Sequence, residues 1–123
     1  MATVLVTEFM DGSALAFLKN RLHVDYVPDL FQRNAELMQR VKEADALIVR
    51  NRTQVTADIF AQAKNLKAVG RLGVGLDNID LKAAAKAHVE VLPATGANAI
   101  AVAEYVMSAL LHLRRPMTTG FQA

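Results

Sequence analysis

The sequence predicts an α/β fold in which a flavodoxin-like five-stranded parallel sheet of order 2-1-3-4-5 lies between helices and is followed by a long C-terminal helix. Short apolar segments rich in β-branched residues alternate repeatedly with segments of helical periodicity. Such alternation is typical of a parallel sheet with helices on both faces. Right-handed crossovers leave few other strand orders for a chain of this size.

The predicted strands are separated by residues that can cap helices. The strands are expected at residues 3–7, 23–27, 45–50, 66–70 and 89–92. The capping residues are expected to be Asp11 or Ser13, then Asn34, Thr56, Asp80 and Asn98. The last helix is apolar nearly all round, and Glu104 is its single acidic residue. That carboxylate is either buried with a partner or part of a solvent-facing side.

Composition excludes several classes of protein. The 123 residues are 53% hydrophobic, which suits one folded domain and not a disordered chain. The net charge is +2 and the basic residues are dispersed, so a nucleic-acid partner is not expected. The absence of cysteine removes disulfides and thiol catalysis and is consistent with a cytoplasmic location.

Other sequence features argue against a secreted, membrane or metal-binding protein. The N-terminal segment lacks the pattern of a signal peptide, and no apolar run is long enough to span a membrane. The three histidines, His23, His88 and His112, share neither a face nor a metal-ligand spacing. We therefore expect no membrane partner and no metal site.

A glycine-rich segment follows the fourth predicted strand. Gly73 and Gly75 can adopt positive φ, and successive N–H groups in such a turn can bind an anion. Arg71 can add a planar fork that suits a carboxylate or a phosphate. The spacing is not the dinucleotide fingerprint, because the position of its third glycine is Asn78.

Polar residues follow three neighbouring strands of the predicted sheet. They occur at residues 50–53, 71–75 and 93–98. Ligands of doubly wound sheets bind outside the carboxyl ends of the strands, so these segments favour a small anion in one crevice. For Arg50 and Arg52, a solvated arginine beside an aspartate is the alternative to a ligand contact. Asn98 is explained first as a helix cap, with a ligand contact as the alternative.

Several segments together resemble the amino-terminal part of the D-isomer-specific 2-hydroxyacid dehydrogenases, in the phosphoglycerate-dehydrogenase-like branch. The segments are residues 47–50, 53–56, 66–80, 93–98 and 102–104. The resemblance covers nearly the whole chain. It implies that residues 1–97 form the substrate lobe, and that residues 98–123 form the interlobe helix and the beginning of a nucleotide-binding lobe.

The resemblance also implies roles for individual residues. Arg50 and Asn51 are expected to approach the substrate, a small anionic 2-hydroxy acid such as 3-phosphoglycerate. Gly73, Val74 and Gly75 are expected to offer backbone amides to its carboxylate. Cofactor contacts are implied for Val74, Asn98 and Glu104, with NAD as the cofactor of the full enzyme. A homo-oligomer formed through the helix at residues 98–115 is expected.

The family's catalytic residues belong to the lobe that should follow, so no catalytic residue is assigned and the chain alone is expected to be inactive. His88 stands where the family usually has glycine, and Leu92 and Ala94 replace typical residues, which leaves the identity of the substrate open.

A stand-alone binding or oligomerisation module is the alternative function. A phospho-receiver is disfavoured because Arg50 stands where a phosphorylated aspartate would be needed.

Overall fold

A computed structural model describes residues 2–73, 75–94 and 99–114. It contains one sheet of five parallel strands in the order β2-β1-β3-β4-β5, which confirms the predicted fold class. The strands are β1 (Thr3–Val6), β2 (His23–Tyr26), β3 (Ala46–Val49), β4 (Ala68–Arg71) and β5 (Glu90–Pro93).

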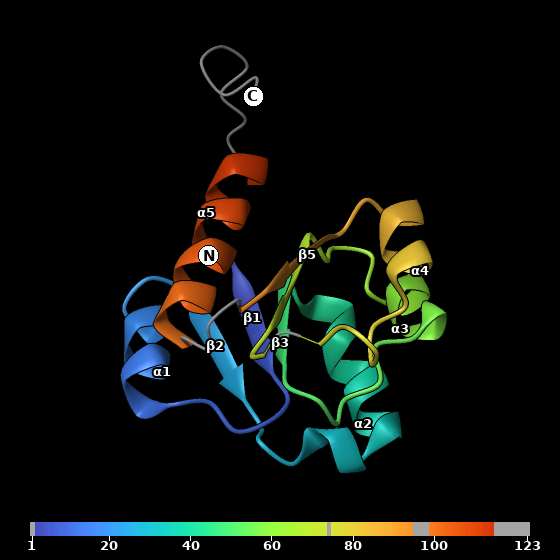
Figure 1. Ribbon diagram of the computed structural model, residues 1–123, viewed down its shortest axis with the longest axis horizontal. Coiled ribbons are helices and arrows are strands. Elements are labelled where there is room, and N and C mark those ends of the chain that lie inside the picture. Colours follow the sequence, from blue (N-terminus) through green and yellow to red (C-terminus); the bar gives the residue numbers. More distant parts are fainter. Residues whose placement is uncertain (1, 74, 95–98, 115–123) are drawn as a thin grey trace.

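Helices cover both faces of the sheet (Figure 1). The α-helices are α1 (Gly12–Lys19), α2 (Asn34–Arg40), α3 (Ala57–Gln62), α4 (Leu81–Lys86) and α5 (Ala99–Arg114). Short 3₁₀ helices, η1 (Leu30–Gln32) and η2 (Val41–Glu43), flank α2. One core cluster packs α1 and α5 on one face, and a second packs α2, α3 and α4 on the other. None of the described helices is long and apolar enough to cross a membrane.

Three of the expected capping residues are confirmed, one is wrong, and Asn98 lies outside the described residues. Asp11, Thr56 and Asp80 each accept a hydrogen bond from a backbone N–H in the first turn of the helix that follows. The expectation that Asn34 caps α2 is wrong. Asn34 is the first residue of that helix, and Arg33 occupies the cap position. The 3₁₀ helix η1 ends one residue before Arg33, which leaves no room for a separate cap at Asn34.

Two strand ends lie further along the chain than expected. Arg71 is the last residue of β4, and it is paired in register with Pro93 of β5. A proline is tolerated there because β5 is an edge strand, and the N–H of Ala94 makes the bond to the Arg71 carbonyl at 2.9 Å. The side chain of Arg71 therefore leaves the sheet at its carboxyl edge.

Helix α5 approaches the sheet closely at Gly70. A Cβ built on Gly70 would lie 2.9 Å from both Val102 Cγ1 and Val106 Cγ2. The buried side of α5 consists of Val102, Ala103, Val106 and Leu110. The small residue in β4 thus lets two β-branched side chains of α5 rest on the sheet.

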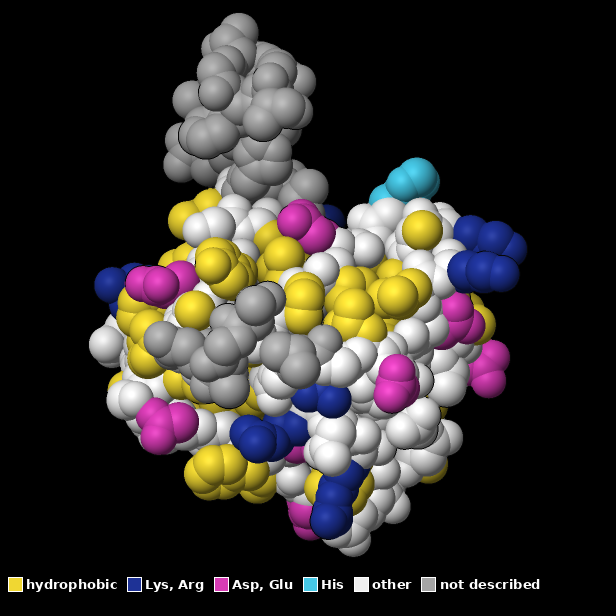
Figure 2. Space-filling view, viewed as in Figure 1, with side chains coloured by type: hydrophobic (Ala, Val, Ile, Leu, Met, Phe, Trp, Pro, Cys, Tyr) yellow, Lys and Arg dark blue, Asp and Glu magenta, His cyan; other side chains and the backbone are white. Residues whose placement is uncertain are grey.

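The other side of α5 carries exposed apolar groups. Tyr105 is 53% exposed and Leu111 is 58% exposed. Glu104 is exposed as well, so the solvent-facing alternative for this carboxylate is correct. Figure 2 shows hydrophobic side chains gathered in a band between α5 and α4, with charged side chains around it. Apolar surface beside α5 is therefore incompletely covered by the described part of the chain.

Replacing Gly70 by alanine is expected to destabilise the fold by about 1–3 kcal/mol, because the added methyl group overpacks the contact with Val102 and Val106. Urea denaturation of the chain measures the change. Gly12→Ala is the control, since a Cβ there meets no atom within 4 Å. Equal stability of Gly70→Ala and the unmodified chain would contradict the close packing of α5.

His88 has a left-handed backbone, with φ of 59°. It follows α4 in a Schellman-type ending, in which Val89 N–H donates to the Ala84 carbonyl at 2.9 Å. Glycine adopts this conformation without a Cβ penalty. The backbone thus accounts for the glycine that is usual at this position in the family that the sequence resembles.

Replacement of His88 by glycine is expected to raise the free energy of unfolding by about 0.5–1 kcal/mol, because the left-handed conformation then carries no Cβ strain. His88→Ala keeps the Cβ and is expected to give no such gain. Thermal denaturation of the three proteins compares them. A His88→Gly variant no more stable than His88→Ala would show that the backbone here is not strained.

Candidate functional site

The candidate site lies at the carboxyl edge of the sheet. Glu8 follows β1, the arginine loop (residues 50–53) follows β3, and Arg71 ends β4. These strands are neighbours in the sheet, and their ends are tied together by Thr7 N–H to the Ile48 carbonyl at 3.1 Å and Leu72 N–H to the Val49 carbonyl at 2.8 Å. Segments distant in sequence therefore form one continuous edge.

The carboxylate of Glu8 is buried beneath the arginine loop, and only 3% of the residue is exposed. Its Oε2 accepts the N–H groups of Arg50 at 2.8 Å and Thr53 at 2.9 Å, and the Thr53 hydroxyl at 2.7 Å. The N–H of Arg52 lies 3.2 Å from both carboxylate oxygens. Such charge-assisted bonds offset the cost of removing the carboxylate from water.

Asn78 holds the same loop from its carbonyl side. Its Nδ2 donates to the carbonyl of Arg50 at 2.8 Å and to that of Thr53 at 2.9 Å. The residue is 7% exposed, and its Oδ1 has no partner among the described residues. The hydroxyls of Thr7 and Thr53 are 2.7 Å apart. The backbone of the arginine loop is therefore fixed through both its donors and its acceptors.

The side chains of the first three residues of the arginine loop face outward, whereas Thr53 is buried. Arg50, Asn51 and Arg52 are all exposed. The guanidinium carbon of Arg52 lies 5.3 Å from the centre of the Phe31 ring, a cation–π contact. Within the described part of the chain, neither Arg50 nor Arg52 forms an ion pair. The expected alternative of an arginine paired with a nearby aspartate is thus absent from these residues, and both guanidinium groups remain available to an anion.

Arg71 folds over the glycines that follow it. Gly73 has a φ of +155°, which confirms the predicted positive φ, and a Cβ there would overlap Nη1 of Arg71. A Cβ on Gly75 would lie 3.7 Å from Nη2 of the same side chain. The Nε of Arg71 is buried without a partner among the described residues, and Nη1 makes one long bond of 3.4 Å to the Leu72 carbonyl. Within the described part of the chain, Arg71 therefore keeps hydrogen-bond donors for an anionic ligand.

The structure brings together some of the predicted site residues and leaves others apart. Arg50, Asn51, Gly73 and Gly75 belong to the carboxyl edge, as expected. Glu104 lies on α5, as an exposed residue. Val74 and Asn98 are outside the described residues. Sequence reasoning assigned no site role to Glu8 or Asn78, and it missed their contacts with the arginine loop. The polarity of a residue directly after a buried strand was the available signal.

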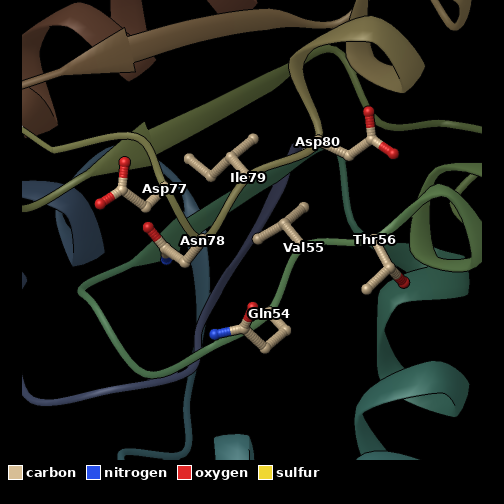
Figure 3. A pocket seen from close by; sticks show the side chains of 7 residues that line it. All are labelled: Gln54, Val55, Thr56, Asp77, Asn78, Ile79 and Asp80. Atoms are coloured by element: carbon tan, nitrogen blue, oxygen red, sulfur yellow. The ribbon is translucent and has the colours of Figure 1, made fainter.

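A depression of about 200 Å³ lies beside Asn78, between residues 54–56 and 77–80 (Figure 3). Val55 and Ile79 form a bridge at its centre, with Val55 N–H donating to the Asn78 carbonyl at 2.8 Å. The carboxylates of Asp77 and Asp80 point to opposite ends of the view, and Asp80 caps α4. No group of acidic or histidine residues suited to a metal occurs in the described ranges.

A second hollow of about 300 Å³ lies at the β2 edge and is lined by Thr3, Leu5, His23, Asp25, Arg40 and Glu43. Arg40 bonds to Glu36 Oε2 and Asp25 Oδ2, each at 2.8 Å. The hydrogen bond to Glu36, followed by the bond to and the charge of Asp25, raises the pKa of Arg40 above its ordinary value. This arginine is already neutralised by its neighbours, so the carboxyl edge is the better candidate for an anion site.

Comparison with known proteins supports the same family that the sequence resembles. Residues 4–119 match the model of the D-isomer specific 2-hydroxyacid dehydrogenase catalytic domain. The (S)-sulfolactate dehydrogenase of Chromohalobacter salexigens is 47% identical over 115 residues, which are 94% of this chain and 37% of that protein. The D-3-phosphoglycerate dehydrogenase of Methanocaldococcus jannaschii is 38% identical over 94% of this chain and 22% of its own length.

A solved structure agrees with these relatives. The crystal structure of the PH0520 protein from Pyrococcus horikoshii has a TM-score of 0.74 and 29% identity, and the match covers 96% of this chain and 35% of that chain. The present chain thus spans between 22% and 37% of the length of these proteins. It belongs to the family of D-isomer specific 2-hydroxyacid dehydrogenases, in the phosphoglycerate-dehydrogenase-like branch.

Proposed function

We propose that this chain is the substrate-binding lobe of an oxidoreductase that transfers a hydride between NAD and C2 of a 2-hydroxy or 2-oxo acid. The observation that carries the proposal is the arginine loop: its backbone is fixed by Glu8 and Asn78 while Arg50 and Asn51 face outward. A fixed backbone with free guanidinium groups is preorganised to bind an anion. In this proposal residues 1–97 are the substrate lobe and residues 98–123 begin the link to a nucleotide-binding lobe.

The proposed substrate carries two anionic groups. The N–H of Gly73 already donates to the Arg71 carbonyl at 2.9 Å, so the substrate carboxylate would accept the N–H groups of the two residues that follow. Its second anion would lie against Arg50, with Arg52 and Arg71 adding positive charge. Sulfolactate and 3-phosphoglycerate, which appear in the names of the relatives, share this plan of a carboxylate, a C2 hydroxyl and an anion at C3. The exposed guanidinium groups of the arginine loop, which form no ion pair with other described residues, favour such dianions over simple hydroxy acids.

The described residues do not by themselves form a dinucleotide site. The turn after β4 leads into an irregular segment, and α4 begins only at Leu81, so no helix N-terminus directly follows Gly73 and Gly75. We therefore propose that NAD is held mainly by a following lobe, with Val74, Asn98 and Glu104 on its near side. NAD, when bound there, supplies the hydride acceptor, and this chain orients the acid.

We further propose that the exposed apolar side of α5 is covered in the complete protein. Tyr105 and Leu111 present apolar area that a second subunit or an adjoining lobe would bury. Homo-oligomerisation through residues 98–115 accounts for this surface. In the alternative, a stand-alone module, the chain itself would be a stable soluble species of 13.4 kDa in its native source.

The complete polypeptide that carries this chain is expected to reduce NAD with (S)-sulfolactate or D-3-phosphoglycerate and much less with lactate, because lactate lacks the second anion. Absorbance of NADH measures the rate.

Arg50→Gln is expected to lower kcat/KM for the dianionic acid by about 10²-fold, since it removes a charge-assisted bond. Arg21→Gln is the control, because Arg21 lies at the opposite, amino edge of the sheet before β2. Equal effects of the two substitutions would contradict the proposed site.

The isolated 123-residue chain is expected to show no NAD-dependent turnover of either acid, because the proton-transferring group and the dinucleotide site are proposed to lie outside it. The assay of the complete protein, run with the same acids, is the positive control. Turnover by the isolated chain would contradict the proposal that the proton-transferring group and the dinucleotide site lie outside it.

A further inference from the structure

We propose that Glu8 is a positioning residue for substrate binding, which holds the arginine loop in the conformation that presents Arg50 and Asn51 to the acid. This assignment rests on the proposed function. Glu8 does not touch the proposed substrate region with its own carboxylate, because that group is buried and turned toward the loop backbone.

The chemistry of the contact explains why a carboxylate is needed. Three N–H groups and one hydroxyl converge on the two oxygens of Glu8. A carboxylate is acceptor-only and satisfies all of these donors. An amide at the same place would present an NH₂ group to N–H groups, so at least one donor would be left unpaired. The loop would then have to move to satisfy it.

The contact also leaves the arginine side chains free. Glu8 binds the backbone N–H groups of Arg50 and Arg52, and it forms no ion pair with either guanidinium. A carboxylate that instead paired with these side chains would compete with the anionic substrate. Glu8 thus fixes two arginines by their backbones without neutralising the charges that the substrate requires.

Glu8 further links the arginine loop to the rest of the edge. It follows β1, whereas Asn78, which holds the opposite side of the loop, lies shortly after Gly73 and Gly75. The two anchors set the position of Arg50 relative to Gly73 and Gly75. Both segments are proposed to contact the same acid, so this relative position determines whether both can bind it at once.

The carboxylate of Glu8 bonds to residues of the arginine loop, whereas the neighbouring Leu5 and Val6 of β1 pack in the hydrophobic core. Loss of its carboxylate is therefore expected to disturb the arginine loop more than the fold.

The test is steady-state kinetics of the complete polypeptide with NAD and with (S)-sulfolactate or D-3-phosphoglycerate. Glu8→Gln is expected to raise KM for the acid by about tenfold or more while kcat changes by less than about threefold. The KM for NAD is expected to stay unchanged. Glu8→Asp keeps the charge on a shorter side chain and is expected to restore part of the affinity. Glu90→Gln, at an exposed glutamate that begins β5 at the opposite edge, is the matched control.

Thr53→Val provides a second variant if Glu8→Gln fails to fold, since it removes only the hydroxyl that donates to Glu8 and contacts Thr7. It is expected to raise KM for the acid by about threefold or more. An unchanged KM in a folded Glu8→Gln or Thr53→Val variant of an active enzyme overturns the assignment of Glu8 alone. An unmodified protein that is inactive toward both acids overturns the proposed function, and this assignment with it.

Discussion

The hydrogen bonds between Glu8 and the arginine loop are the interaction on which the candidate site depends. A loop that ends a buried strand must satisfy its backbone groups without the sheet ladder. Here the carboxylate of Glu8 accepts hydrogen bonds from the N–H groups of the loop, and the side-chain amide of Asn78 donates to its carbonyl groups. The side chains of Arg50 and Asn51 are then not needed to hold the loop, and they are available at the surface for binding.

The remainder of the fold places the ends of the strands around that loop. Parallel pairing aligns the carboxyl ends of β1, β3 and β4, and the buried positions of these strands fix their register. The chain uses rigid elements to bring Glu8, Arg50 and Arg71 to one edge. The same packing requires glycine at position 70, where α5 rests on β4.

The fold could be predicted from the sequence because its signals are local. Apolar runs, capping residues and the alternation of elements each depend on a few neighbouring residues, and the strand order followed from chirality. The positive φ at Gly73 was likewise predictable. Asn34 was assigned wrongly because the preceding 3₁₀ helix η1, which displaced it, has little sequence signal of its own.

The candidate site could be predicted only in part. Arg50, Asn51 and the two glycines, Gly73 and Gly75, could be predicted as site residues because their chemistry suits an anion and because they follow predicted strands. Glu8 and Asn78 act across 42 and 28 sequence positions from Arg50, so a local pattern can show a polar residue near a strand end but not its bonding partner. Their contacts exist only once β1, β3 and the segment after β4 have been brought together.

Amide hydrogen exchange at residues 50, 52 and 53 in the complete protein tests the central claim most directly. If Glu8 fixes the arginine loop as described, the N–H groups of Arg50 and Thr53 exchange as slowly as those of the adjoining strand β3, although the side chains around them are exposed. Exchange as fast as in an unstructured surface loop would show that the loop is not held by the buried carboxylate, and would contradict the account.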